Sequence, residues 1–142
     1  MSQARTMARR CAVQALYQWQ VSGNDVEEIY QQFLTERNMT NVNVEMFKEL
    51  LSGVTRELEK LDETITPYLD RDLSEVDPVE RAVLRLGTYE LMYKPDVPYR
   101  VVINEALEAV KTFGAEQGHR FVNGVLDKVA QQVRRLEIKS RV

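Results

Sequence analysis

Cysteine and histidine are nearly absent from this chain of 142 residues, in which each occurs once, as Cys11 and His119. A single cysteine cannot form a disulfide bond within the chain. One cysteine and one histidine also fall short of the ligands of a usual zinc site. No serine or cysteine stands near His119 in the sequence to suggest a catalytic triad. We therefore expect no disulfide, no metal and no other cofactor.

Long apolar runs are missing too. No run approaches the roughly 18 apolar residues that a membrane span requires. The N-terminal sequence MSQARTMARRC lacks the apolar core of a signal peptide. These absences predict a cytoplasmic protein that makes no membrane contact. The 44% of apolar and 29% of charged residues are typical of one ordinary globular domain.

Sequence patterns that carry catalysis are not found. The chain has no glycine-rich phosphate loop. Glu105 and Glu108 could be paired carboxylates, but Glu108 is also placed to form a surface ion pair with Lys111. One cluster of acids lacks the ordered ligand spacing and the glycine of a calcium loop: Asp70, Asp72, Glu75 and Asp77. We interpret it as an exposed acidic turn and expect that the protein is not an enzyme.

Apolar residues recur every three or four positions, and no stretch alternates or clusters β-branched residues as a strand does. The pattern predicts an all-α protein. About seven helices are expected, over residues 3–21, 26–37, 44–59, a short stretch to about 69, 78–93, 99–113 and 119–136. Helices one to three would form one small bundle, about 1–60, and the others a second, about 61–142, within one domain spanning 1–142.

Two helix boundaries have clear sequence signals. Gly23 can end the first helix because glycine readily takes the left-handed conformation. Asp77, Pro78 and Glu80 provide a cap, a proline in the first turn and a carboxylate that can reach back to the cap. The fifth helix is therefore expected to begin at this point. Its apolar residues on nearly every side are typical of a central helix.

Charge is unevenly distributed, although the net charge is only −3. Residues 1–24 carry three arginines and no acid, whereas residues 25–96 have a net charge of −9. Residues 128–142 have a net charge of +4. Basic ends suit contact with a nucleic acid, although solvated basic tails are common in proteins that bind none.

The first predicted helix has two faces when its side chains are placed about 100° apart. Its expected core face consists mostly of small residues: Ala8, Ala12, Ala15, Leu16 and Trp19. The opposite face, which we expect to be exposed, contains Arg9, Arg10, Val13 and Tyr17. Arginine beside an exposed aromatic ring suits single-stranded RNA, because the guanidinium meets phosphate while the ring stacks on a base. The alternative is that Val13 and Tyr17 contact another helix or a partner.

Several separated motifs resemble those of the NusB family. They are ARRCAVQALY at 8–17, VERAVLRLG at 79–87, YEL at 89–91, INEA at 103–106 and FVNGVLD at 121–127. Their order and spacing fit over the whole chain. The resemblance implies an all-α transcription antitermination factor that binds boxA RNA of nascent ribosomal RNA together with ribosomal protein NusE. It would act in the antitermination complex of RNA polymerase with other Nus factors.

The resemblance also implies roles for individual residues. RNA contacts are expected on the first helix, with a second contact surface at the start of the last: Arg5, Arg9, Arg10 and Tyr17, then Gln117, Arg120 and Phe121. NusE is expected at the junction of the two halves, around Tyr68, Arg71 and Glu80. An acidic surface there could meet a basic ribosomal protein.

The chain departs from the family pattern at two places. Thr6 and Met7 interrupt an arginine cluster that relatives often carry, which predicts fewer phosphate contacts and a weaker salt dependence of RNA binding. Gly118 stands where a serine commonly caps the last helix, and glycine is a tolerable cap.

Other functions remain open at this stage. Similar domains precede ribosomal RNA cytosine methyltransferases, so the chain could be an accessory domain of such an enzyme. It could also be a helical scaffold that binds NusE without RNA. A homodimer formed through Val13 and Tyr17 would cover the proposed RNA face.

Overall fold

The computed structural model describes residues 3–113 and 116–140, and every regular element in that part is helical. The α-helices are α1 Gln3–Ser22, α2 Val26–Glu36, α3 Val44–Arg56, α4 Leu58–Ile65, α5 Pro78–Tyr93, α6 Tyr99–Thr112, α7 His119–Val133 and α8 Arg135–Ser140. Short 3₁₀ turns occur at η1 Thr66–Tyr68, η2 Leu73–Glu75 and η3 Glu116–Gly118. The prediction of an all-α fold is confirmed. None of the described helices has the length and apolar character needed to span a membrane.

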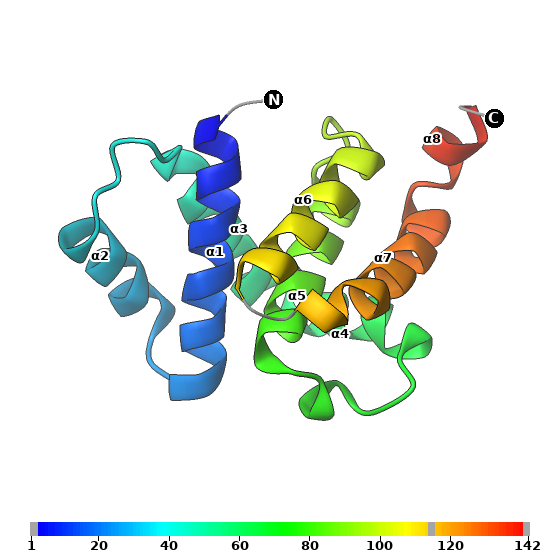
Figure 1. The fold of residues 1–142 in the computed structure, drawn as a ribbon, viewed down its shortest axis with the longest axis horizontal. Helices are drawn as coiled ribbons and strands as arrows, with labels where there is room; N and C mark the ends of the chain where they lie inside the picture. Colours follow the sequence, from blue (N-terminus) through cyan, green and yellow to red (C-terminus); the bar gives the residue numbers. More distant parts are fainter. Residues whose placement is uncertain (1–2, 114–115, 141–142) are drawn as a thin grey trace.

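Helix α5 lies in the centre of the molecule. It packs against α1, α3, α4, α6 and α7, and Figure 1 shows it between α1 and α7. The buried apolar residues of all these helices form one continuous core. Helix α5 therefore packs against helices of both predicted bundles, residues 1–60 and 61–142. The division into two bundles stays an interpretation.

A close approach between α3 and α5 depends on Gly53. A Cβ atom at this position would lie 2.3 Å from the ring of Tyr89, so a larger residue would push the two helices apart. Tyr89 is itself buried, and its hydroxyl lies 3.4 Å from a carboxylate oxygen of Glu49 on α3. The contact fixes the position of α5 relative to the first half of the chain.

The start and stop signals in the sequence agree with the structure in part. Gly23 has a φ of 72°, and the Asp77 carboxylate accepts hydrogen bonds from the N–H groups of Val79 and Glu80 at 3.0 and 3.2 Å. The Glu80 side chain does not reach back to the cap, because its carboxylate lies against Gly118 instead. The sequence located both boundaries but misassigned one contact.

One predicted helix ends early in the structure, and another is split in two. The third was expected to continue to residue 59, but the backbone leaves the helical conformation at Glu57, between α3 and α4. The last was expected to continue to residue 136, but it ends at Val133 and a short α8 follows. The break in the last helix falls at Arg134, whose side chain turns into the protein. The helix count was therefore one too low.

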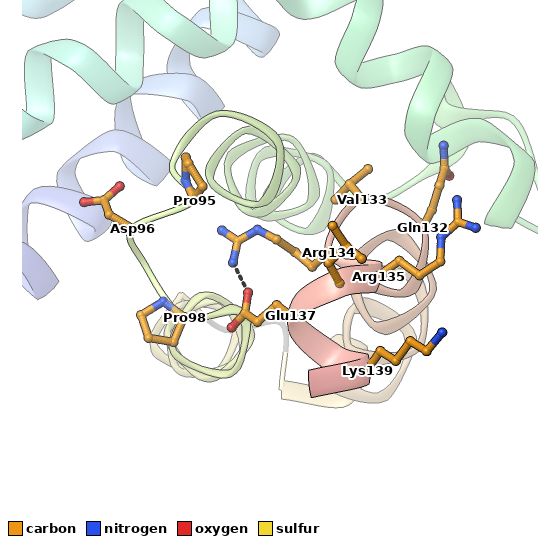
Figure 2. Close-up of a pocket in the computed structure, with 10 residues that line it drawn as sticks. Pro95, Asp96, Pro98, Gln132, Val133, Arg134, Arg135, Glu137 and Lys139 are labelled. Carbon is orange, nitrogen blue, oxygen red and sulfur yellow. Dashed lines mark hydrogen bonds and ion pairs between the residues drawn. The ribbon is translucent and has the colours of Figure 1, made fainter. Parts of the chain in front are cut away.

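Arg134 binds the end of α5. Its Nε donates to the carbonyl of Leu91 at 2.7 Å, and its Nη2 donates to the carbonyls of Glu90 and Lys94 at 3.2 and 2.9 Å. Its Nη1 donates to the carbonyl of Val97 at 2.9 Å. Figure 2 shows this side chain pointing into the end of α5, while Arg135 points away. The last carbonyls of a helix need such partners, and a cation also suits the negative end of the helix dipole.

Glu137 completes this junction. Its carboxylate forms an ion pair with Arg134 and accepts a hydrogen bond from the backbone N–H of Tyr99 at 3.0 Å. Tyr99 is the first residue of α6, so one ion pair joins the end of α5, the start of α6 and the start of α8. The basic C-terminal segment thus has a structural role that its composition did not reveal.

Replacing Arg134 by alanine is expected to lower the free energy of unfolding by about 2–4 kcal/mol, because several buried carbonyls lose their donor. Arg135→Ala is the matched control, since Arg135 is exposed, and it should change stability by no more than about 0.5 kcal/mol. Urea unfolding followed by circular dichroism measures both variants. Equal effects of the two substitutions would show that Arg134 does not act as the cap of α5.

Candidate nucleic-acid interface

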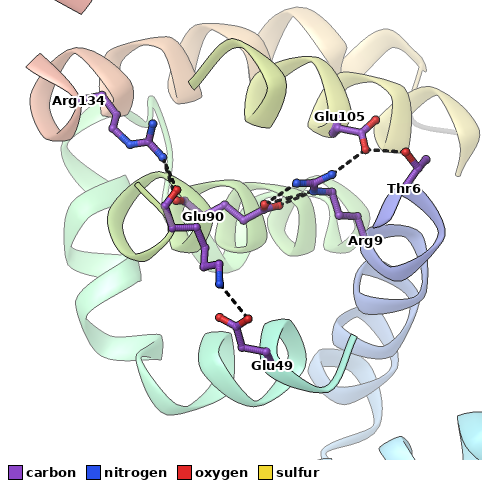
Figure 3. A network of polar contacts seen from close by, with 7 residues as sticks. Thr6, Arg9, Glu49, Glu90, Glu105 and Arg134 are labelled. Carbon is purple, nitrogen blue, oxygen red and sulfur yellow. Dashed lines mark hydrogen bonds and ion pairs between the residues drawn. The ribbon is translucent and has the colours of Figure 1, made fainter. Parts of the chain in front are cut away.

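Arg9, which the sequence placed on the exposed face of the first helix, is buried in the structure. Only 5% of its surface is exposed. Its Nε lies 2.9 and 3.2 Å from the two carboxylate oxygens of Glu90, and its Nη2 lies 2.9 Å from one of them. Its Nη1 donates to Glu105 at 2.9 Å, and Thr6 donates to the same Glu105 oxygen at 2.8 Å (Figure 3). The predicted exposure of Arg9 is therefore wrong.

The charges of this network compensate one another. Burial lowers the pKa of Arg9, but its hydrogen bonds and ion pairs with Glu90 and Glu105 outweigh that effect and raise the pKa overall. Glu90 is only 2% exposed and comes from the central helix α5, while Glu105 comes from α6. Arg9 therefore remains charged and fixes α1 against both helices.

Val13 is the second residue whose predicted exposure is wrong. It is 2% exposed, because α1 packs against α2 and α3 on one side and against α5 and α6 on another. The predicted core stripe is otherwise confirmed, with Ala8 and Leu16 fully buried and Trp19 partly buried. A helix with two packed sides has a broader buried surface than a single stripe in the sequence suggests.

The exposed part of the first helix is smaller than predicted. Tyr17 is 41% exposed, Arg5 is exposed, and Arg10 is half-buried. Within the part of the chain that the structure describes, Arg10 forms no ion pair. Arg10 and Tyr17 are available to a ligand, whereas Arg9 holds the helix that carries them. We call Arg5, Arg10 and Tyr17 the α1 surface.

The second predicted RNA surface lies at η3 and the first turn of α7. Gln117 and Arg120 are exposed there, and Phe121 is half-buried. The guanidinium of Arg71 lies over the Phe121 ring, 4.7 Å from its centroid, which is a cation–π contact. One face of the ring is therefore covered by a residue that the sequence assigned to partner binding.

All three predicted partner residues contact α7 or the turn before it. The Tyr68 hydroxyl donates to Gln132 at 2.8 Å, and Arg71 covers Phe121. Glu80 packs against Gly118 so closely that a Cβ there would lie 2.2 Å from its carboxylate oxygen. Burial and the nearby Asp77 carboxylate raise the pKa of Glu80, and Arg71 opposes them. The two predicted surfaces are thus adjacent.

Sequence reasoning missed Glu90 and Glu105 as partners of Arg9. Glu90 stands in a helix that is apolar on nearly every side, and a carboxylate in such a place needs a buried cation. The sequence thus contained a sign that Glu90 needs a cation, but that cation, Arg9, is 81 residues away along the chain.

The expected ion pair of Glu108 with Lys111 is confirmed, with a distance of 3.7 Å. Among the described residues, no group of His, Cys, Asp and Glu could hold a metal ion.

Comparison with known proteins points to one family. The NusB family model matches residues 6–131. Transcription antitermination protein NusB of Shewanella halifaxensis is 55% identical over 130 residues, which cover 92% of this chain and 96% of that protein. The protein of the same name from Nitrosococcus oceani is 52% identical over 141 residues, covering 99% and 95%.

Solved structures agree with the sequence comparison. A crystal structure of antitermination factors NusB and NusE in complex with double-stranded RNA contains a chain that superposes with a TM-score of 0.85 at 30% identity. The match covers 93% of this chain and 99% of that one. The solution structure of NusB from Aquifex aeolicus superposes with a TM-score of 0.79 at 30% identity, covering 90% and 88%.

Arg9→Ala is expected to lower the free energy of unfolding by about 3–5 kcal/mol, because it leaves the buried Glu90 carboxylate without its cation. The neighbouring Arg10→Ala should change stability by at most about 0.5 kcal/mol. Denaturant unfolding of both variants measures the difference. The double substitution Arg9→Met with Glu90→Met should recover part of the loss, since it leaves no charge at position 90. If Arg9→Ala is as stable as Arg10→Ala, the ion pair does not hold α1 in place.

Proposed function

The chain belongs to the NusB family, and we propose that it is a transcription antitermination factor that binds RNA and ribosomal protein NusE. It catalyses no reaction. The RNA is the boxA element of nascent ribosomal RNA, and the protein works in the cytoplasm within the antitermination complex of RNA polymerase and other Nus factors. The observation that carries the proposal is the similarity over nearly the whole chain to proteins with this name and to a chain in a NusB–NusE–RNA complex.

RNA binds on the α1 surface. Arg10 has no carboxylate partner among the described residues, so its cation can contact a phosphate. Tyr17 exposes an aromatic ring on which an unpaired base can stack. Arg9 acts indirectly, because its guanidinium is already bound by Glu90 and Glu105 and serves to position α1. This role replaces the direct RNA contact that the sequence alone suggested for Arg9.

A second RNA contact forms at Gln117, Arg120 and Phe121. Arg120 supplies an exposed cation, and Phe121 supplies a ring whose far side is held by Arg71. NusE binds next to it, around Tyr68, Arg71 and Glu80. Because these three side chains contact α7 or the turn before it, NusE and RNA meet on adjoining surfaces. A partner that orders Arg71 would also fix the Phe121 ring for stacking.

The alternative functions have less support. The relatives match over 95–96% of their own length and are named antitermination proteins, which favours an RNA-binding adaptor over an accessory domain of a methyltransferase. A scaffold that does not bind RNA would give Arg10 and Tyr17 no role in binding. A homodimer through the α1 surface would have to rely on Tyr17, because Val13 is buried.

Arg10→Ala and Tyr17→Ala are each expected to weaken binding of a boxA-type RNA about tenfold, through loss of a phosphate contact or a stacked ring. Binding is measured by fluorescence anisotropy over a salt series, with and without NusE, against a scrambled RNA. Arg10→Ala should also lower the slope of log K against log salt by about 1.

Matched controls separate this surface from general effects. Arg100→Ala removes an exposed cation at the start of α6, and Tyr93→Ala removes a tyrosine that is 37% exposed on α5. Both should bind RNA like the wild type. Equal binding of boxA-type and scrambled RNA by the wild-type protein with NusE present would remove the proposed function and leave the fold unaffected.

A further inference from the structure

Gly124 lies in the middle of α7, on the exposed face of the helix. Glycine in the middle of a helix lowers stability relative to alanine, because it loses more conformational freedom on folding. A Cβ atom at Gly124 would have no heavy atom within 4 Å, so packing inside the protein does not require a glycine there. Its φ is not positive, so the backbone conformation does not require one either.

The other four glycines that the structure describes each have a structural reason. Gly23 has a φ of 72°. An added Cβ atom would come closer than 3.0 Å to another side chain at the remaining three: Gly53, Gly87 and Gly118. Gly124 is the exception among them. The missing side chain at this position leaves the backbone of α7 open to close approach by another molecule.

Two cations flank this glycine on the same side of α7. Arg120 comes four residues before Gly124 and Lys128 four residues after it, and residues four apart are neighbours on a helix surface. At 1.5 Å per residue, Arg120 and Lys128 are separated by about 12 Å along the helix axis. Both are exposed, and neither forms an ion pair among the described residues. We call Arg120, Gly124 and Lys128 the α7 stripe.

The α7 stripe continues the RNA surface proposed at the start of the helix. Arg120 belongs to both, and Phe121 lies three residues before Gly124. Asp127 is the only acid of α7, and its carboxylate accepts a hydrogen bond from Gln131 at 3.0 Å. Cations therefore outnumber acids along the helix. Such a surface attracts a polyanion and does not favour a basic protein.

We propose that the sugar–phosphate backbone of the bound RNA crosses α7 at Gly124, with one phosphate on Arg120 and another on Lys128. The absence of a side chain at Gly124 lets the RNA lie directly against the helix. Phosphate contacts position a nucleic acid without reading its sequence. In this position they hold the strand so that an unpaired base can reach the Phe121 ring. Gly124 and Lys128 are thereby added to the RNA-binding residues.

The inference rests on the proposed function, because it concerns the RNA that the protein is proposed to bind. Gly124→Ala and Gly124→Gln place side chains of increasing size in the path of the RNA. Thermal unfolding should show a Tm raised by about 3 °C for Gly124→Ala, because alanine favours the helix. Fluorescence anisotropy with boxA-type RNA and NusE should show affinity reduced about tenfold or more for Gly124→Gln, and less for Gly124→Ala. A purely structural glycine would lose stability and affinity together.

Lys128→Gln tests the second phosphate contact. It removes the cation and keeps a flexible polar side chain, so it should lower the slope of log K against log salt by about 1 and leave the Tm unchanged. Lys48→Gln and Ser52→Gln are the matched controls for charge and for added side-chain size, because both positions are exposed on α3. Both controls should bind RNA like the wild type.

Three results would overturn the proposal. If the wild type prefers boxA-type to scrambled RNA and Gly124→Gln binds it equally well, the inference fails and the proposed function stands. If Gly124→Gln instead loses affinity for NusE alone, measured by isothermal titration calorimetry, and keeps its RNA affinity, this side of α7 contacts the protein partner. If the wild type does not distinguish the two RNAs, the proposed function fails and the inference fails with it.

Discussion

The ion pair between Arg9 and Glu90 is the contact on which the arrangement of the other helices depends. The Glu90 side chain binds the first helix, while its backbone carbonyl accepts a hydrogen bond from Arg134 near the other end of the chain. One residue of the central helix α5 therefore joins segments from both termini. Glu105 extends the same network to α6. The orientation of α1, and with it the exposure of Tyr17, follows from these charges.

A buried ion pair is seldom a large net source of stability, because removing two charges from water offsets most of their attraction. The main effect of this ion pair is to fix the position of α1 relative to α5. Apolar contacts between α1 and α5 could tolerate a shift of one helix along the other, but a guanidinium held by two carboxylates has one position. Two adjacent arginines thus have different uses: Arg9 determines where the helix lies, and Arg10 remains available to a ligand.

The proposed binding surfaces are connected through α7 and the turn before it. Tyr68, Arg71 and Glu80 each touch this element, and Arg71 covers one face of Phe121. A protein partner and an RNA bound there would both contact this group of side chains. The proposal assigns RNA to basic side chains such as Arg10 and Arg120, and a basic protein to the acidic middle of the chain.

The sequence by itself determined the fold class, the central position of α5 and most helix ends, because apolar periodicity, Gly23 and the Asp77 cap are local properties of the chain. The exposure of Tyr17 and the partial exposure of Arg10 could be predicted on the same basis. The burial of Arg9 and Val13 and the break at Arg134 were decided only by the tertiary structure. Each depends on which helices pack against which, and on partners such as Glu90, 81 residues from Arg9. Periodicity along one helix contains no information about a second helix on its other side.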